Sequence, residues 1–171
     1  FKQKTAYEVY MGDWSSDVRS SDLSGRVDLS QLTASLPLSA LPAAAVPGGW
    51  SGTINLKLAT LTVEKGWPAR IEGTVEVRDL AGPARKPANM GSYKVTFPAA
   101  QAGKEIVGAL TDLGGSLEIA GSLHLKPDRS YLIEGVVATR PDAPQSISDS
   151  LQYLGAPDAQ GRRPFSIAGT M

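Results

Sequence analysis

Alternation of apolar and polar side chains is the main structural signal in this chain. Every second residue is apolar in runs over residues 54–58, 61–63, 71–77, 93–97, 117–125, 131–137 and 165–167. A period of two predicts antiparallel strands with one buried face and one solvated face. The alternation shifts by one residue at Ala59–Thr60, and this shift predicts a β-bulge.

Turn-forming residues separate these runs and support a series of hairpins. Lys65-Gly66, Gly114-Gly115 and Pro127-Asp128 supply the positive or fixed φ that a reversal of the chain needs. Glycines such as Gly121 and Gly135 fall on the apolar face of the runs, where they permit bending or a close approach of two backbones. The sequence therefore predicts an all-β fold: a curled antiparallel sheet, built as a hairpin meander, that is open or partly closed.

One segment has the spacing of an amphipathic helix. Ile147, Leu151 and Leu154 are four and three residues apart, and Gly155 and Pro157 follow them as stop signals. The sequence therefore predicts one short helix near residues 144–154, with its apolar side on the sheet.

The first 22 residues differ in origin from the rest. Back-translation of Lys2 to Glu8, and of Asp13 to Leu23 with one base changed at Arg19, resembles a short-read sequencing adapter. We therefore predict that residues 1–22 are a non-native leader, which we expect to be disordered. Residues 23–171 are predicted to form a single β-rich domain, truncated at its N-terminus, as in a fragment from metagenomic reads.

Charge and composition exclude several classes of partner and site. The 171-residue chain has 17 basic and 17 acidic side chains, so no excess charge points to nucleic acid. Without cysteine, disulfides and cysteine-ligated metals are excluded. No apolar run reaches the ~20 residues of a membrane-spanning helix.

The sequence offers little catalytic chemistry. His124 is the single histidine, and it lies on the polar face of a strand without a recognisable nucleophile motif. A zinc site usually needs three or four ligands of the His, Cys or acidic type. Aspartates such as Asp112, Asp128 and Asp158 are typical of turns and caps. We therefore expect no catalytic residue, no cofactor and no metal, and hence no enzyme.

Four side chains are candidates for contact with a partner. Arg162 and Arg163 form a local basic pair near Asp158, while Trp50 and Trp67 lie beside glycine or proline at strand ends. Arginine and tryptophan are enriched in protein interfaces. The alternative interpretation is that the two arginines lie in a solvated turn and that the two tryptophans are core side chains.

An ordered series of residues between Leu110 and Gly169 resembles the C-terminal, periplasmic half of type II secretion system protein N. The series includes Leu110 to Leu117, Leu123 to Tyr131, Arg140 to Asp142 and Leu154 to Arg162, and Leu36 to Leu41 extends the resemblance toward the N-terminus. The resemblance implies a single inner-membrane helix followed by a periplasmic β-rich region. We expect the helix and the first part of that region to be missing from this chain. It implies localisation at the periplasmic side of the Gram-negative inner membrane.

Three classes of function are considered, and an enzyme is disfavoured because the usual catalytic motifs are missing. Two functions remain open. The resemblance implies a non-catalytic accessory or assembly subunit of the secretion machinery, with the secretin or the inner-membrane platform as expected partners. The alternative is a lipid-handling sheet of the inter-membrane transport type. Lipid handling predicts an apolar face left open to solvent, whereas assembly predicts that the helix near residues 147–154 covers this face.

Overall fold

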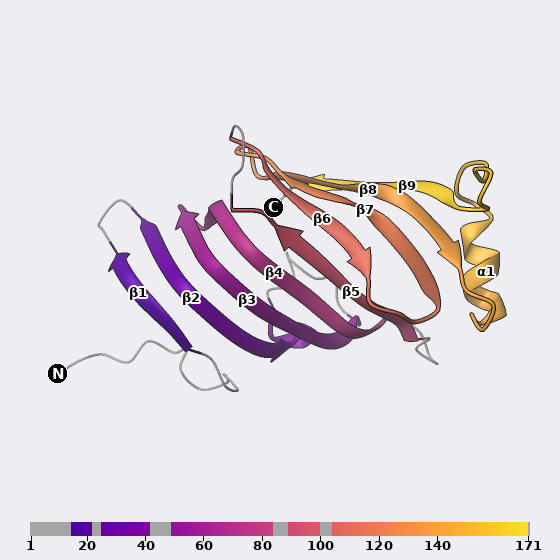
Figure 1. Cartoon of the computed structure of the whole chain (residues 1–171), viewed down its shortest axis with the longest axis horizontal. Helices are drawn as coiled ribbons and strands as arrows, with labels where there is room; N and C mark the ends of the chain where they lie inside the picture. Colours follow the sequence, from indigo (N-terminus) through magenta and orange to yellow (C-terminus); the bar gives the residue numbers. More distant parts are fainter. Residues whose placement is uncertain (1–14, 22–24, 42–48, 84–88, 100–103, 171) are drawn as a thin grey trace.

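One antiparallel sheet dominates the computed structural model, which describes residues 15–21, 25–41, 49–83, 89–99 and 104–170. Within these residues nine strands pair in sequence order, with β1 and β9 at the two edges of the sheet. Figure 1 shows this succession from β1 to β9 across a strongly curved sheet, with α1 beside the ends of β8 and β9. The predicted curled hairpin meander is confirmed, and among the described residues β1 and β9 do not pair to close it.

The strands and helices have the following bounds. They are β1 (Ser15–Ser21), β2 (Arg26–Pro37), the 3-10 helix η1 (Leu38–Ala40), β3 (Ser51–Glu64), β4 (Trp67–Ala81), β5 (Asn89–Phe97), β6 (Ile106–Asp112), β7 (Leu117–Leu125), β8 (Ser130–Thr139), α1 (Gln145–Leu151) and β9 (Arg163–Thr170). The predicted helix near residues 144–154 is confirmed, and it begins and ends inside those limits. No helix in the described part of the chain has the length and hydropathy needed to cross a membrane.

The predicted bulge in β3 is also present. Leu58 pairs with Gly73 and Thr60 pairs with Glu72, so Ala59 is an extra residue opposite β4. Beyond this point the apolar side chains continue at Leu61 and Val63, on the same face as Leu58. The bulge thus keeps the apolar side chains on one face of the sheet while it increases the local bend.

Two buried clusters hold this face together. The larger one joins strands β2 to β6 and consists of Leu32, Ala34, Leu58, Ile71, Phe97 and Ile106. The smaller one consists of Leu117, Val137 and Ile147, and it joins β7 and β8 to α1. The helix is therefore fixed to the sheet by burial of its apolar side, as its spacing predicts.

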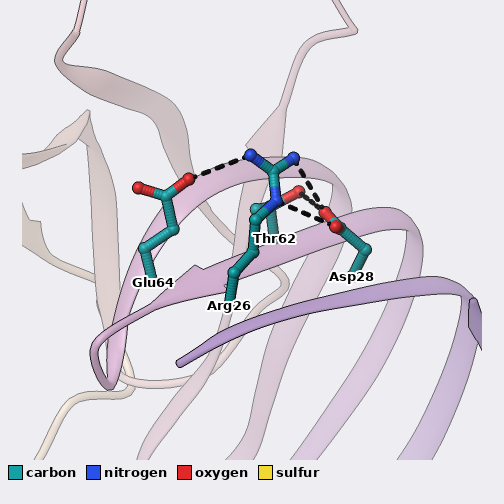
Figure 2. Close-up of polar contacts among 4 residues, drawn as sticks. All are labelled: Arg26, Asp28, Thr62 and Glu64. Atoms are coloured by element: carbon teal, nitrogen blue, oxygen red, sulfur yellow. Dashed lines mark hydrogen bonds and ion pairs between the residues drawn. The ribbon is translucent and has the colours of Figure 1, made fainter. Parts of the chain in front are cut away.

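The opposite face carries polar contacts between neighbouring strands. Near the end of the β2–β3 pair, Arg26 donates to both Asp28 and Glu64, at 2.9 and 3.1 Å. The hydroxyl of the buried Thr62 donates to Asp28 over 2.7 Å. Figure 2 shows this cluster, in which the guanidinium of Arg26 lies between the two carboxylates. It connects two strands whose sequence separation exceeds thirty residues, at an exposed site where ion pairs contribute little stability.

Strand β1 lies within the leader that the sequence predicts to be non-native. The structure pairs residues 15–21 with β2, while residues 1–14 and 22 lie outside the described residues. Backbone hydrogen bonds at a sheet edge accept almost any sequence as an added strand. Pairing of β1 is therefore compatible with either origin, and the adapter origin of the leader stays a prediction.

Candidate functional site

A groove with an almost wholly apolar lining lies on the inner face of the curved sheet. It has a volume of ≈ 400 Å³, and its lining includes Leu38, Trp50, Val95, Leu110, Phe165 and Ile167. Strands β4 and β9 are five places apart in the sheet, a separation of about 24 Å if the sheet were flat. Side chains of both line this groove, so the sheet curls around it with the apolar face inside.

Helix α1 covers part of the same face. Ile147 is buried against Leu117 and Val137, and Leu151 and Leu154 pack around them. The groove stays open beside this helix, because Ile167 in its wall is 53% exposed. Lipid handling predicts an open apolar face and assembly predicts a covered one. The structure has both, with a helix over one part of the apolar face and an open groove over another.

An ion pair lies at the end of the groove next to Tyr93. Arg140 donates to Asp112 over 2.6 Å, and the backbone N–H groups of Gly114 and Ile119 donate to the same carboxylate. Burial alone would raise the pKa of Asp112, but the donors from Arg140 and the backbone outweigh it and hold the pKa below its usual range. Asp112 is thus a neutralised, fully hydrogen-bonded carboxylate that connects the end of β6 to the segment after β8.

Tyr93 is fixed in the wall of the groove. Its hydroxyl donates to the backbone carbonyl of Met90. Burial raises the pKa of Tyr93 to about 12, with a further contribution from the charge of Asp112. Tyr93 therefore remains protonated at any physiological pH and acts as a structural donor rather than as an acid or base.

The four predicted contact residues lie in three different places. Arg162 binds Asp158 through Nε and Nη2, at 3.0 and 2.9 Å, inside the turn before β9. Arg163 lies on the inner face of the sheet, where Nη1 donates to the carbonyls of Leu154 and Gly155. The two neighbouring arginines thus have separate roles, because Arg162 lies in the turn before β9 and Arg163 is the first residue of the strand.

The two tryptophans are also apart. Trp50 lines the apolar groove. Trp67 lines a second, polar hollow of ≈ 550 Å³ near the β3–β4 turn, together with Lys65, Lys104 and Arg129. The structure therefore brings Trp50 and Arg163 to the inner face and leaves Trp67 and Arg162 outside it.

His124 has polar partners on the outer face of the sheet. Its Nε2 is 2.8 Å from the hydroxyl of Ser122, and its Nδ1 is 3.3 Å from Oε1 of Glu105. These distances resemble a serine–histidine–acid array, but Ser122 lies in the middle of β7, between β6 and β8. Backbone N–H groups there are used in the sheet and cannot form an oxyanion hole. The arrangement is best described as polar contacts between strands.

No metal centre is formed by the described residues, among which no group of three or more histidine, cysteine, aspartate or glutamate side chains is placed to hold an ion. The inner groove therefore stands as the candidate functional site, with the Asp112–Arg140 ion pair at one end and Arg163 on the same face of the sheet. The sequence predicts the apolar faces and a curled sheet, but it does not predict which strands the curl brings together, here β4 and β9 at one groove.

Comparison with known proteins gives a consistent result. Residues 3–166 match the family model of "Type II secretion system (T2SS), protein N". A protein of that name from Aeromonas hydrophila is 34% identical over 64 residues, a match that covers 37% of this chain and 25% of that protein. A second, from Aeromonas salmonicida, is 38% identical over 45 residues, which cover 26% of this chain and 96% of that sequence. No solved structure gives a significant match.

Proposed function

Because the chain belongs to the family of type II secretion system protein N, we propose that it is a non-catalytic assembly subunit of the secretion machinery, acting through protein contacts in the periplasm. The matched segment spans about a quarter of the Aeromonas hydrophila protein. The contacts are therefore proposed for this chain and not for the whole length of that relative. The secretin and the inner-membrane platform are the proposed partners. The proposed location is the periplasmic side of the inner membrane.

The observation that carries this proposal is the outer edge of β9. This strand pairs with β8 on one side, and within the described residues no strand pairs with its other side. Most of its residues are exposed, Ile167 among them. An open edge of this kind can accept a strand from another protein, with main-chain hydrogen bonds supplying affinity and the exposed side chains supplying specificity.

Pro164 indicates which backbone groups face outward. A proline in a sheet is tolerated where its missing N–H would point away from the neighbouring strand. The backbone N–H and carbonyl groups of successive residues point to alternate sides of a strand, so those of Ser166 and Ala168 share the orientation of Pro164. Their N–H and carbonyl groups are therefore the ones available to an added strand.

Replacement of Ala168 by proline tests this mode of assembly. The protein, with an affinity tag, is expressed in the bacterium that encodes it. We expect co-purification of secretion subunits to fall about tenfold in Ala168→Pro, because one outward donor is lost and the added strand meets a proline ring. Quantitative mass spectrometry of the captured proteins measures the change.

The matched control is Ala168→Val, which retains the N–H group and favours the strand conformation. We expect this variant to capture secretion subunits as the parent does. Equal capture by the proline and valine variants would contradict assembly through the β9 edge. If the parent itself captured no secretion subunit, the proposed function would be refuted.

A further inference from the structure

The lining of the inner groove restricts the chemistry of what it can bind. Its walls are almost entirely aliphatic and aromatic, and the Tyr93 hydroxyl already donates to Met90. An extended peptide placed there would bury backbone N–H and carbonyl groups that find no partner, at a cost of about 1–3 kcal/mol for each group. A hydrocarbon chain has no such groups to satisfy, and burial of each methylene contributes about 0.8 kcal/mol.

The dimensions agree with this chemistry. The groove of ≈ 400 Å³ lies within the range of about 300–1,000 Å³ that is typical of small-ligand sites, and it is of the size of one long acyl chain. Because its wall is open at Ile167, a lipid headgroup can remain in water while its chain is buried. The helix α1 narrows this face but does not fill the groove.

The charges on the inner face favour a negative headgroup. Strands β5 to β9 place two charged residues on this face, Asp112 and Arg163, as their register shows. Asp112 is neutralised by Arg140. Arg163 lies two residues before Phe165 in the groove wall, and among the described residues it has no acidic partner. It binds two carbonyls through Nη1 alone, so the remaining guanidinium N–H groups are available to an anion.

We propose that the inner groove binds an acyl chain of an anionic phospholipid, with the phosphate of the headgroup at Arg163. This is a ligand site additional to the protein contacts at the β9 edge. The apolar walls supply affinity without regard to the headgroup, and Arg163 supplies the preference for a negative one. A single lipid held in this way would leave the convex face and the outer edge of β9 free.

Quenching of Trp50 fluorescence by a brominated lipid tests the proposal on the purified full chain. The probe is phosphatidylglycerol with bromine atoms on one acyl chain, compared with the same brominated chain on zwitterionic phosphatidylcholine. Trp50 lines the groove, so bound bromine is expected to quench it. We expect Trp50→Phe to abolish the quenching and Trp67→Phe, at the other hollow, to preserve it.

Two pairs of neighbouring residues provide matched variants. Leu110 lines the groove and Ala109 lies on the opposite, exposed side of the same strand. We expect Leu110→Asp to raise the half-saturating lipid concentration about tenfold or more and Ala109→Asp to leave it unchanged. Arg163→Gln is expected to remove an about tenfold preference for phosphatidylglycerol, whereas Arg162→Gln, in its local turn, retains it.

Several results would overturn the proposal. Absence of Trp50 quenching in the parent chain would do so, as would equal effects of Leu110→Asp and Ala109→Asp. If circular dichroism shows that Leu110→Asp does not fold, the comparison passes to Ile167→Asp, whose position is exposed enough to accept a charge. Partner capture through Ala168 uses no lipid, so lipid binding and the assembly function can fail independently.

Discussion

Replacement of Phe97 by alanine is expected to lower the free energy of unfolding by about 3–5 kcal/mol. Phe97 is 3% exposed and belongs to the larger buried cluster. Its ring lies over Gly108 on the neighbouring strand, where a Cβ would come within 2.7 Å of Cε1 of the ring. A glycine backbone cannot fill the space that the ring would leave, so the cavity is expected to remain open.

Urea denaturation followed by circular dichroism measures this change, with the full chain as reference. Thr96→Ala is the matched control, since Thr96 is the exposed neighbour on the other face of β5. We expect the control to change the free energy of unfolding by less than about 0.5 kcal/mol. A loss below about 1 kcal/mol in Phe97→Ala would show that the core does not lie on this face.

Replacement of Gly121 by alanine is expected to cost about 3 kcal/mol, at the upper end for an overpacked site. Gly121 pairs with Gly135 across β7 and β8. A Cβ at Gly121 would overlap the carbonyl oxygen of Glu134 and lie 2.9 Å from Cα of Gly135. Both are backbone atoms, so relief of the overlap requires the two strands to separate.

Hydrogen exchange locates the effect of Gly121→Ala. We expect the amides of β7 and β8 to exchange faster than in the parent, while those of β3 and β4 change little. Ala120→Val adds a larger side chain at the next, exposed position of β7 and is expected to leave exchange unaffected. Unchanged exchange in Gly121→Ala would contradict the close approach of these strands.

Regular alternation explains which strands the sequence predicts and which it misses. The runs in β3, β4, β5, β7, β8 and β9 alternate, with one shift in β3, and the sequence predicts all six strands. It does not predict strand β2, because its apolar side chains change position at Gln31, which has a φ of 57°. The sequence does not predict strand β6 either, since Gly108 and Asp112 occupy its inner face and weaken the apolar signal. Only pairing with neighbouring strands identifies both segments.

The site depends even more on contacts distant in sequence. The Asp112–Arg140 pair joins residues 28 positions apart, and no local pattern predicts it. Arg162 and Arg163 are alike in sequence, and only the start of β9 at Arg163 turns the second arginine toward the groove. The tryptophans are also apart, because Trp50 precedes β3 and Trp67 begins β4, and these antiparallel strands start at opposite ends of the sheet. The sequence therefore identifies individual candidate residues. Which of them lie close together depends on how the sheet curls, and only the structure shows this.

The central claim, that the chain joins the secretion machinery through the edge of β9, is tested most directly by photo-crosslinking in living cells. A photoreactive phenylalanine is placed at Ser166 in the full-length protein. The control position is Thr96, which lies in the same row of paired residues, four strands further into the sheet. We predict an adduct between Ser166 and a secretion subunit, with none from Thr96. Equal labelling from both positions, or no secretion subunit in the Ser166 adduct, would contradict the account.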